Sequence, residues 1–317
     1  MKHGLSLGPA FFKGHGHGND YLVFEEGVGW PGSPEAMQVM CHPHRGIGAD
    51  GIVALLSRPP HEKPAQGRSP LGPEPLFRLR MFNPDGSEFE RSGNGLRVLG
   101  AYLYSKGRIG LGQPFSVEVG GGVVQMEVLG EGPGGLVELS VEMGTARFGI
   151  DVVGGNPISF GPGPTLAGPS GVPLAVSLVS IGNPHCVLFR DRLSEEEMGE
   201  LGPFLSTHRA FLSGTNVQLA RVVGDRKVEI LIWERGVGRT SSSGTSACAV
   251  ASAGVQAGLL LPGRITVGME GGSFAVTVSA ESNVRLEGPV QPLFSGELAR
   301  EMLESLSEVF GAADRCP

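Results

Sequence analysis

The chain has 317 residues with a formal net charge of −7, and 40% of its residues are apolar. This length suits two domains that each bury a core, while the negative charge argues against a nucleic-acid partner. No apolar run approaches the roughly 20 residues of a membrane span, the N-terminus lacks the apolar region of a signal peptide, and four cysteines do not suggest a disulfide framework. We therefore expect a cytoplasmic protein without a membrane partner.

Strand patterns recur along the chain. Alternating apolar and polar residues predict strands at residues 77–82, 115–119, 123–128, 137–142, 176–180, 186–189, 217–222, 228–233 and 273–278. Helices of small and apolar residues are predicted at 95–105 and 245–260, and an amphipathic helix at 297–310. Because a helix that is apolar on nearly all sides has to be enclosed, we expect a curled sheet around each of the first two. The predicted fold class is α+β, with two halves that each wrap a sheet around a central helix.

The two halves repeat one local arrangement. Asn83 and Glu234 each follow an aromatic residue, and each lies nine positions before a Ser-Gly pair that begins at Ser92 or Ser243. In both halves this pair opens a predicted helix. A site built from two matching loops can place similar side chains on opposite sides of one small molecule, which inversion at a carbon centre requires.

The repetition extends upstream in the same order. Gly18-Asn19 is matched by Gly182-Asn183, and His44-Arg45 before Asp50 is matched by His208-Arg209 before Asn216. The first half is longer, because 73 positions separate residues 19 and 92 but only 60 separate residues 183 and 243. Residues 59–75 are rich in Pro and charge and read as a surface insertion that accounts for the difference. We infer a duplicated fold.

The two helix starts predict an anion site. Backbone N–H groups at a helix N-terminus attract anions, so that two such termini suit a carboxylate substrate. A single serine before a helix is usually only an N-cap, but the shared upstream residues favour a functional pocket. The glycines of each pair would let a ligand approach the backbone. The residues concerned are Ser92, Gly93, Asn94, Ser243, Gly244 and Thr245.

These motifs together resemble the diaminopimelate epimerase family of pyridoxal-independent amino-acid racemases. The resemblance covers most of the chain and rests on His15-Gly16-x-Gly18-Asn19-Asp20, Gly46-Ile47-Gly48-Ala49-Asp50-Gly51, Phe82-Asn83-x-Asp85-Gly86-Ser87-Glu88, Gly182-Asn183-Pro184-His185, Thr215-Asn216-Val217, Glu234-Arg235-Gly236-x-Gly238 and Gly244-Thr245-x-Ala247-Cys248-Ala249. It implies domains at 1–146 plus 291–317 and at 147–290, related by pseudo-two-fold symmetry, with the active site in the cleft between them. It also implies cofactor-independent conversion of LL-diaminopimelate to the meso form, a step of lysine biosynthesis.

The resemblance implies a role for each polar landmark. It implies that Arg235 pairs with the substrate carboxylate and that Glu234 faces an ammonium, while the distal amino-acid end is bound by Asn19, Asn83, Asn183 and Asn216. His185 either orients Glu234 or is a satisfied loop histidine. Cys41-His42-Pro43-His44 lacks a partner cluster at ligand spacing, so no metal is expected. The expected partner is a small amino-acid substrate, and a homodimer is possible.

One departure from the family affects its chemistry. The family's two bases are cysteines, whereas this chain has serine at both positions, Ser92 and Ser243. A serine hydroxyl is far less acidic than a thiol and needs a neighbouring base. Three interpretations follow: an epimerase whose cysteines were replaced on purpose, a paralogous isomerase of another small amino or carboxylic acid that uses other acid–base groups, or a metabolite-binding relative without turnover. The candidate acid–base groups are Glu234, His185, Asp50 and Glu90.

Overall fold

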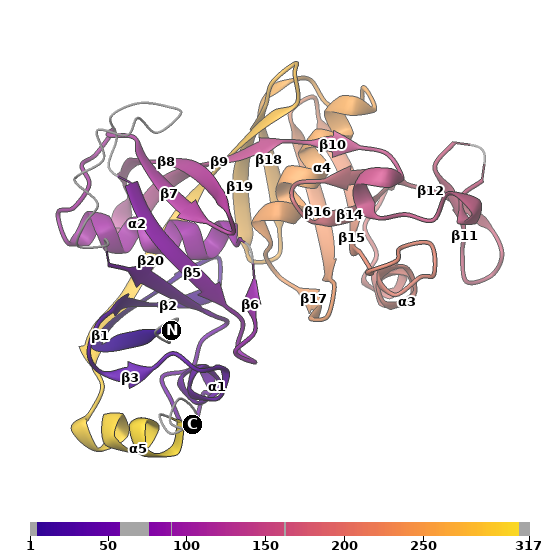
Figure 1. Cartoon of the computed structure of the whole chain (residues 1–317). Helices are drawn as coiled ribbons and strands as arrows, with labels where there is room; N and C mark the ends of the chain where they lie inside the picture. Colours follow the sequence, from indigo (N-terminus) through magenta and orange to yellow (C-terminus); the bar gives the residue numbers. More distant parts are fainter. Residues whose placement is uncertain (1–4, 58–75, 90, 162, 311–317) are drawn as a thin grey trace. The chain divides into compact units, whose positions relative to one another are not determined.

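A computed structural model describes residues 5–57, 76–89, 91–161 and 163–310 (Figure 1). The predicted insertion at 59–75 and the candidate Glu90 lie outside these ranges. The chain divides into two compact units. Unit 1 comprises residues 1–141 and 289–317, and unit 2 comprises residues 142–288.

Unit 1 is a mixed sheet with two helices between its strands and a third at its C-terminal end. Its elements in chain order are β1 (Ser6–Gly16), β2 (Asn19–Glu26), β3 (Trp30–Pro31), α1 (Pro34–Cys41), β4 (Ile52–Leu56), β5 (Leu76–Phe82), β6 (Glu88–Phe89), α2 (Gly93–Ser105), β7 (Phe115–Val119), β8 (Gly122–Glu131), the start of β9 (Val137–Thr145), the end of β20 (Asn283–Glu297) and α5 (Arg300–Phe310). The C-terminal helix α5 contacts α1 and β3.

Unit 2 has the same layout of strands and helices. Its main elements are β10 (Arg147–Phe148), β13 (Ser177–Ser180), β14 (Pro184–Phe189), α3 (Glu195–Ser206), β15 (Asn216–Gly224), β16 (Lys227–Glu234), β17 (Gly238–Thr240), α4 (Gly244–Gln256), β18 (Gly263–Met269), β19 (Gly272–Val278) and the start of β20. The short strands β11 (Thr165–Ala167) and β12 (Pro173–Ala175) form a separate hairpin.

Seven strand pairings follow the same order and directions in the two units. In unit 1 two pairs are parallel, β2–β4 and β5–β7. The other neighbours are antiparallel: β1–β2, β4–β5, β5–β6, β7–β8 and β8–β9. In unit 2 the corresponding pairs β14–β15 and β16–β18 are parallel. The remaining neighbours are antiparallel: β13–β14, β15–β16, β16–β17, β18–β19 and β19–β20. This agreement in order and direction supports the inferred duplication, because unrelated sheets have no reason to share it.

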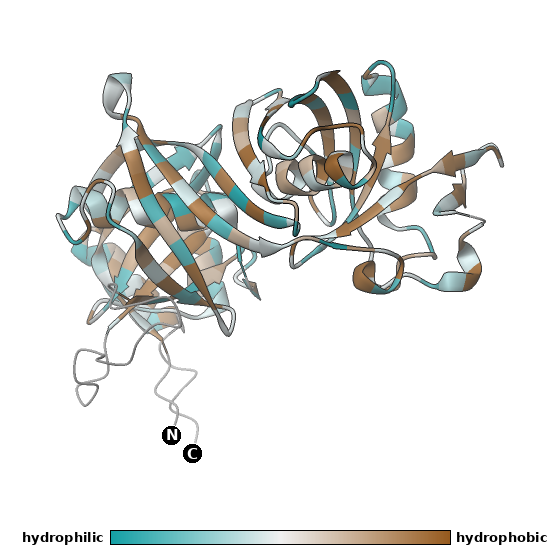
Figure 2. Cartoon of the chain, turned by 90° about the horizontal axis from the view of Figure 1, so that it is seen from above, coloured by the Kyte–Doolittle hydropathy of each residue, from teal (hydrophilic) through white to brown (hydrophobic). Residues whose placement is uncertain are grey.

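Each unit encloses one helix. In α2 every residue from Gly93 to Leu103 is buried, and in α4 every residue from Ser246 to Gly254 is buried. Helix α4 contacts β13, β14, β15, β16, β18 and β19, and α2 contacts β1, β2, β4 and β8. The strands themselves alternate between brown and teal bands in Figure 2, as expected where one face packs inward and the other faces water. The predicted curled sheet around a buried helix is therefore confirmed.

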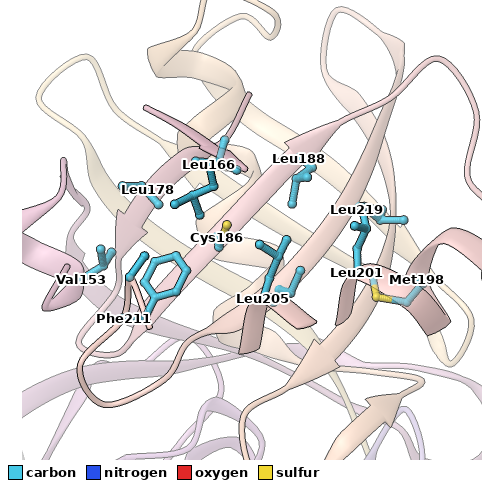
Figure 3. Close-up of a cluster of buried hydrophobic side chains, with 13 residues drawn as sticks. Val153, Leu166, Leu178, Cys186, Leu188, Met198, Leu201, Leu205, Phe211 and Leu219 are labelled. Carbon is cyan, nitrogen blue, oxygen red and sulfur yellow. The ribbon is translucent and has the colours of Figure 1, made fainter. Parts of the chain in front are cut away.

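A second apolar layer lies on the outer face of each sheet. In unit 2 the side chains of Leu178, Cys186 and Leu219 on the strands meet Leu201 and Leu205 of α3 (Figure 3). In unit 1 the corresponding cluster includes Trp30, Met37 of α1 and Leu306 of α5. Helices α1 and α3 therefore cover equivalent faces, and the enclosed helices α2 and α4 occupy the opposite ones.

The predicted strands are all present, and the two enclosed helices are close to their predicted ranges. Helix α4 ends at Gln256 rather than near residue 260, because Gly258 takes a left-handed φ of 69° that terminates the helix. Helix α5 starts at Arg300 rather than at 297, because Glu297 still belongs to β20. The sequence patterns did not identify the longer strands β1, β2, β4, β18 and β20 or helix α1. Strand β4 in particular is a continuous apolar run that pairs in parallel with β2, so it shows no alternation.

Helix α3 was also missed, because Gly199, Gly202 and Pro203 weaken its sequence pattern. Its position is nevertheless fixed by packing, since a Cβ at Gly202 would come within 2.7 Å of the Trp233 ring. None of the helices in the part of the chain that the structure describes combines the length and the hydrophobicity needed to cross a bilayer.

Candidate functional site

Both enclosed helices begin with the same serine N-cap. The Ser92 Oγ accepts a hydrogen bond from the Gly95 N–H at 3.2 Å, and the Ser243 Oγ accepts one from the Ser246 N–H at 3.5 Å. Both serines have extended backbone angles, as an N-cap requires. Each serine thus has a structural role that leaves its own hydroxyl proton available as a donor.

The Ser243 hydroxyl has a carboxylate partner. It donates to Glu234 Oε2 at 3.3 Å, and the Thr240 hydroxyl donates to Glu234 Oε1 at 2.8 Å. Glu234 is the last residue of β16 and Thr240 the last of β17, so the short antiparallel pair β16–β17 presents the carboxylate to the start of α4. Glu234 is half-buried and Ser243 is buried. The arrangement can move a proton between a hydroxyl and a carboxylate.

The matched position in unit 1 has different chemistry. Asn83 stands where Glu234 stands in unit 2, and its amide donates to Ser87 Oγ at 2.9 Å. The Ser92 backbone N–H meets the Met81 sulfur at 3.3 Å. Within the described part of unit 1, the Ser92 hydroxyl is therefore an N-cap acceptor without a carboxylate or imidazole partner. An amide such as that of Asn83 cannot take up a proton at neutral pH.

A chain of side-chain hydrogen bonds supports the start of α2. Asn94 Nδ2 donates to Asn19 Oδ1 at 2.8 Å, and Asn19 Nδ2 donates to Asp50 Oδ2 at 2.9 Å. Asp20 and Asp50 form reciprocal hydrogen bonds. The Asp20 N–H donates to the Asp50 carboxylate at 3.1 Å, and the Asp50 N–H donates to the Asp20 carboxylate at 2.9 Å. Asp50 thus stabilises a turn, and it also fixes the amide orientation of Asn19.

Sequence analysis overlooked Arg97, which completes this chain. Its side chain is fully buried, its Nε donates to the Gly93 carbonyl at 3.2 Å, and its guanidinium donates to Asn94 Oδ1. A Cβ at Gly16 would lie 2.9 Å from the Arg97 guanidinium, so the glycine makes room for it. A single charge in an otherwise apolar helix was the signal that could have identified this residue.

The polar residues of unit 2 are held by backbone groups. Asn216 is buried, its amide nitrogen donates to the Pro184 carbonyl at 3.0 Å, and its amide oxygen accepts from the Arg235 N–H at 3.0 Å. The Arg235 side chain is exposed and donates to the Ser213 carbonyl at 2.8 Å. The first residue of β15, Asn216, thus contacts Arg235, which directly follows Glu234 at the end of β16.

His185 is fully buried, and its Nε2 lies 2.9 Å from Asn183 Oδ1. The pKa of His185 is lowered to about 3, mainly by burial and also by the positive charge of Arg235, while the Gln218 amide acts in the opposite direction. The imidazole is therefore neutral at physiological pH. His185 lies in β14 rather than in a loop, and its buried Nδ1 has no hydrogen-bond partner among the described residues, so the interpretation as a satisfied loop histidine is not supported.

This pKa shift predicts acid sensitivity of unit 2. The unfolded chain binds a proton at His185 below about pH 6.5, whereas the folded chain does not until about pH 3. His185 should therefore reduce the free energy of unfolding by up to about 1.4 kcal/mol for each pH unit between these values as the pH falls. The measurement is urea unfolding from pH 7 to pH 4, followed by Trp233 fluorescence in a Trp30→Phe background. His185→Gln should flatten the dependence, and an unchanged slope would contradict the assignment.

The described thiols do not replace the bases at positions 92 and 243. Burial raises the pKa of Cys186 to about 12, and burial with the charges of Asp20 and Asp50 raises that of Cys41 to about 12. Cys248 of α4 is completely buried in the core of unit 2. Across the ranges that the structure describes, no three His, Cys, Asp or Glu side chains gather in a set that could hold a metal ion.

The glycines at the helix starts are explained partly by packing. A Cβ at Gly244 would come within 2.8 Å of Leu286 Cδ2 on β20. Gly93 is buried at the first turn of α2, and its carbonyl accepts from Arg97. The N–H groups of Gly93, Asn94, Gly244 and Thr245 belong to the first helical turns, whose N–H groups have no partner within the helix and can bind an anion.

Known proteins are similar to this chain over nearly its whole length. A model of the family described as diaminopimelate epimerase matches residues 11–149 and 177–292. The chain is 36% identical over 300 residues to diaminopimelate epimerase 2 of Nostoc sp., covering 92% of this chain and 96% of that protein. It is 35% identical over 293 residues to diaminopimelate epimerase of Pelotomaculum thermopropionicum, covering 90% and 98%.

Solved structures share the fold at lower identity. A predicted epimerase from Pseudomonas aeruginosa superimposes with a TM-score of 0.63 at 22% identity and covers 92% of this chain and 99% of that one. A hydroxyproline epimerase from Agrobacterium vitis, solved with bound trans-4-hydroxy-L-proline, gives a TM-score of 0.61 at 16% identity and covers 97% and 98%. These two structures therefore share the fold of this chain.

Proposed function

This chain belongs to the diaminopimelate epimerase family of isomerases, and we propose that it transfers protons at the Cα of LL-diaminopimelate to give the meso form. The relatives named for this reaction cover at least 90% of the chain. The observation that carries the proposal is the hydrogen bond between the Ser243 hydroxyl and the Glu234 carboxylate at the N-terminus of α4. It supplies the neighbouring base that a serine needs.

Proton removal uses this couple. As Ser243 Oγ takes the Cα proton, its own hydroxyl proton passes to Glu234 Oε2, so that the serine is never a free alkoxide. The negative charge that develops on the substrate carboxylate is stabilised by the N–H groups of Gly244 and Thr245 and by the helix dipole. Ser92, which caps the N-terminus of α2, is the second residue that we propose to transfer a proton, without a carboxylate partner in the described part of unit 1. No step requires a bound cofactor.

Substrate recognition uses the polar residues around the two helix starts. Arg235 is exposed and fixed by Ser213, and it binds a substrate carboxylate. The amides of Asn19, Asn83, Asn183 and Asn216 bind the distal amino-acid end, each retaining donor or acceptor capacity after its internal bonds. His185 is neutral and holds Asn183, so we assign it a positioning role rather than proton transfer.

The test is deuterium uptake at Cα in D2O with LL-diaminopimelate, measured for the parent chain by mass spectrometry. We expect uptake that depends on the protein and saturates with substrate. A Ser92→Cys/Ser243→Cys variant serves as the reference, since it has the family's thiols. Uptake in neither protein would show that the pocket takes another small amino or carboxylic acid and would overturn the diaminopimelate assignment.

A further inference from the structure

We propose that Arg239 and Thr240 act together as a clamp that fixes the Glu234 carboxylate opposite the Ser243 hydroxyl. All four residues belong to unit 2, so the inference concerns this unit alone. It rests on the proposed function, because it assigns a positioning role to residues that support the Ser243–Glu234 couple. Neither Arg239 nor Thr240 takes up or releases the transferred proton.

The two oxygens of the Glu234 carboxylate have different partners. The Thr240 hydroxyl donates to Oε1 at 2.8 Å, and the Ser243 hydroxyl donates to Oε2 at 3.3 Å. A carboxylate turns broadly about its terminal torsion unless a donor holds it. The bond from Thr240 is the shorter of the two, and it leaves Oε2 for the serine. Thr240 therefore selects the oxygen that accepts from Ser243.

Arg239 fastens the strand that carries Thr240. Its Nε and Nη2 donate to the two carboxylate oxygens of Glu195, in the first turn of α3, at 3.0 and 2.8 Å. Nη2 also donates to Glu270, which lies between β18 and β19, at 3.2 Å. Nη1 donates to the Thr240 carbonyl. One guanidinium thus joins the Thr240 backbone to α3 and to the β18–β19 turn, a use that suits the forked donors of arginine.

Strand β17 depends on such ties because it is short. It has three residues and pairs with β16. The carbonyl of Ser241, which follows it, accepts from the Gly271 N–H at 2.9 Å, so the β18–β19 turn holds this segment a second time. The Arg239 side chain is 26% exposed, whereas that of Arg264 in a surface ion pair is 64% exposed. The ties of Arg239 are therefore better shielded from water than those of a surface pair.

The first measurement is deuterium exchange at the Cα of LL-diaminopimelate in D2O. Thr240→Val removes the hydroxyl and should lower the exchange rate at saturating substrate about tenfold, the effect of one hydrogen bond to a charged group. The KM should change little, because Thr240 acts on Glu234 rather than on the substrate. Thr240→Ser restores the hydroxyl and should recover most of the rate. Arg239→Met should lower it in the same direction but less, since it acts through Thr240.

The second measurement needs no turnover. In a Ser243→Cys background, mass spectrometry follows alkylation of position 243 by iodoacetamide. The Glu234 carboxylate should slow this reaction, because a nearby negative charge disfavours the thiolate. Thr240→Val should release the carboxylate and speed alkylation about threefold or more, and Thr240→Ser should not. In a Glu234→Gln background Thr240→Val should have no further effect, because the contact through which it acts is gone.

Matched variants separate the clamp from general effects on unit 2. Arg264 of β18 pairs with Glu287 at 3.0 Å, so Arg264→Met removes an exposed guanidinium. Thr277 is half-buried on β19, so Thr277→Val makes the same substitution on another strand. Both variants should exchange and alkylate at the rates of their parents.

The outcomes distinguish this inference from the proposed function. Alkylation that Thr240→Val leaves unchanged, or changes equally in the Glu234→Gln background, would overturn the clamp whatever the exchange shows. Exchange that Thr240→Val leaves unchanged in an active parent would overturn it as well. A Glu234-dependent effect on alkylation, without exchange in either the parent or the Ser92→Cys/Ser243→Cys variant, would keep the clamp and overturn the diaminopimelate assignment. Exchange in that variant alone would keep the clamp and show that the Ser243–Glu234 couple transfers no proton.

Discussion

Replacing both Ser92 and Ser243 with cysteine is expected to increase the rate of LL- to meso-diaminopimelate conversion by about 10²-fold or more, the range that general acid–base catalysis contributes. A thiol has an ordinary pKa near 8.5, and a helix N-terminus lowers it, so both positions would gain a group that can give and take a proton alone. The first turns of α2 and α4 are already in place, since both serines cap them. The measurement is the initial rate of meso-isomer formation.

The two single variants sharpen this prediction. Ser92→Cys should restore most of the inversion, because Ser92 is the residue whose hydroxyl has no carboxylate partner in the described part of unit 1. Ser243→Cys should give less, since Glu234 already assists the serine at 243 and would raise the pKa of a neighbouring thiol through its negative charge. A larger gain at position 243 than at 92 would contradict this order.

Removing the buried guanidinium of Arg97 is expected to reduce the free energy of unfolding of unit 1 by about 3 kcal/mol or more. Arg97→Met keeps the apolar volume but leaves the Gly93 carbonyl and Asn94 Oδ1 without their charged donor, and each such bond contributes about 1.5–3 kcal/mol. The measurement is urea unfolding followed by Trp30 fluorescence in a Trp233→Phe background, because Trp30 lies in the core of unit 1. Substrate affinity should fall as well, since Asn94 and Asn19 lose their fixed orientation.

The matched control for Arg97 is Arg80, which lies on β5 and pairs with Glu88 in a partly exposed position. Arg80→Met should change the free energy of unfolding by less than about 1 kcal/mol, because such ion pairs contribute little. Arg97→Lys should retain part of the stability, since it keeps the charge but loses the forked donor geometry. Equal effects of Arg97→Met and Arg80→Met would contradict a supporting role of the buried guanidinium.

The sequence by itself determined the class of the fold and the positions of the serines. Alternating strands, two enclosed apolar helices and a repeated order of landmarks are local patterns, and each follows from burial on one face or on all faces. The sequence did not locate several elements, among them β2, β4 and α3. Strand β4 is a continuous apolar run without alternation, and Gly202 of α3 is required by its packing on Trp233, so no local periodicity identifies these two elements.

Only the tertiary structure decided which residues hold the candidate site. The sequence placed Glu234 nine positions before Ser243 and Asn83 nine positions before Ser92, but this spacing is the same in both halves. The pairing of β16 with β17 brings Glu234 within hydrogen-bonding distance of the Ser243 hydroxyl, while the Asn83 amide bonds to Ser87 instead. Likewise the bond from Asn19 to Asp50 joins residues far apart in the sequence, and the bond from Arg97 to Asn94 lies within a buried helix. Hydrogen bonds of this kind depend on distances of tenths of an ångström between side chains, which sequence spacing does not specify.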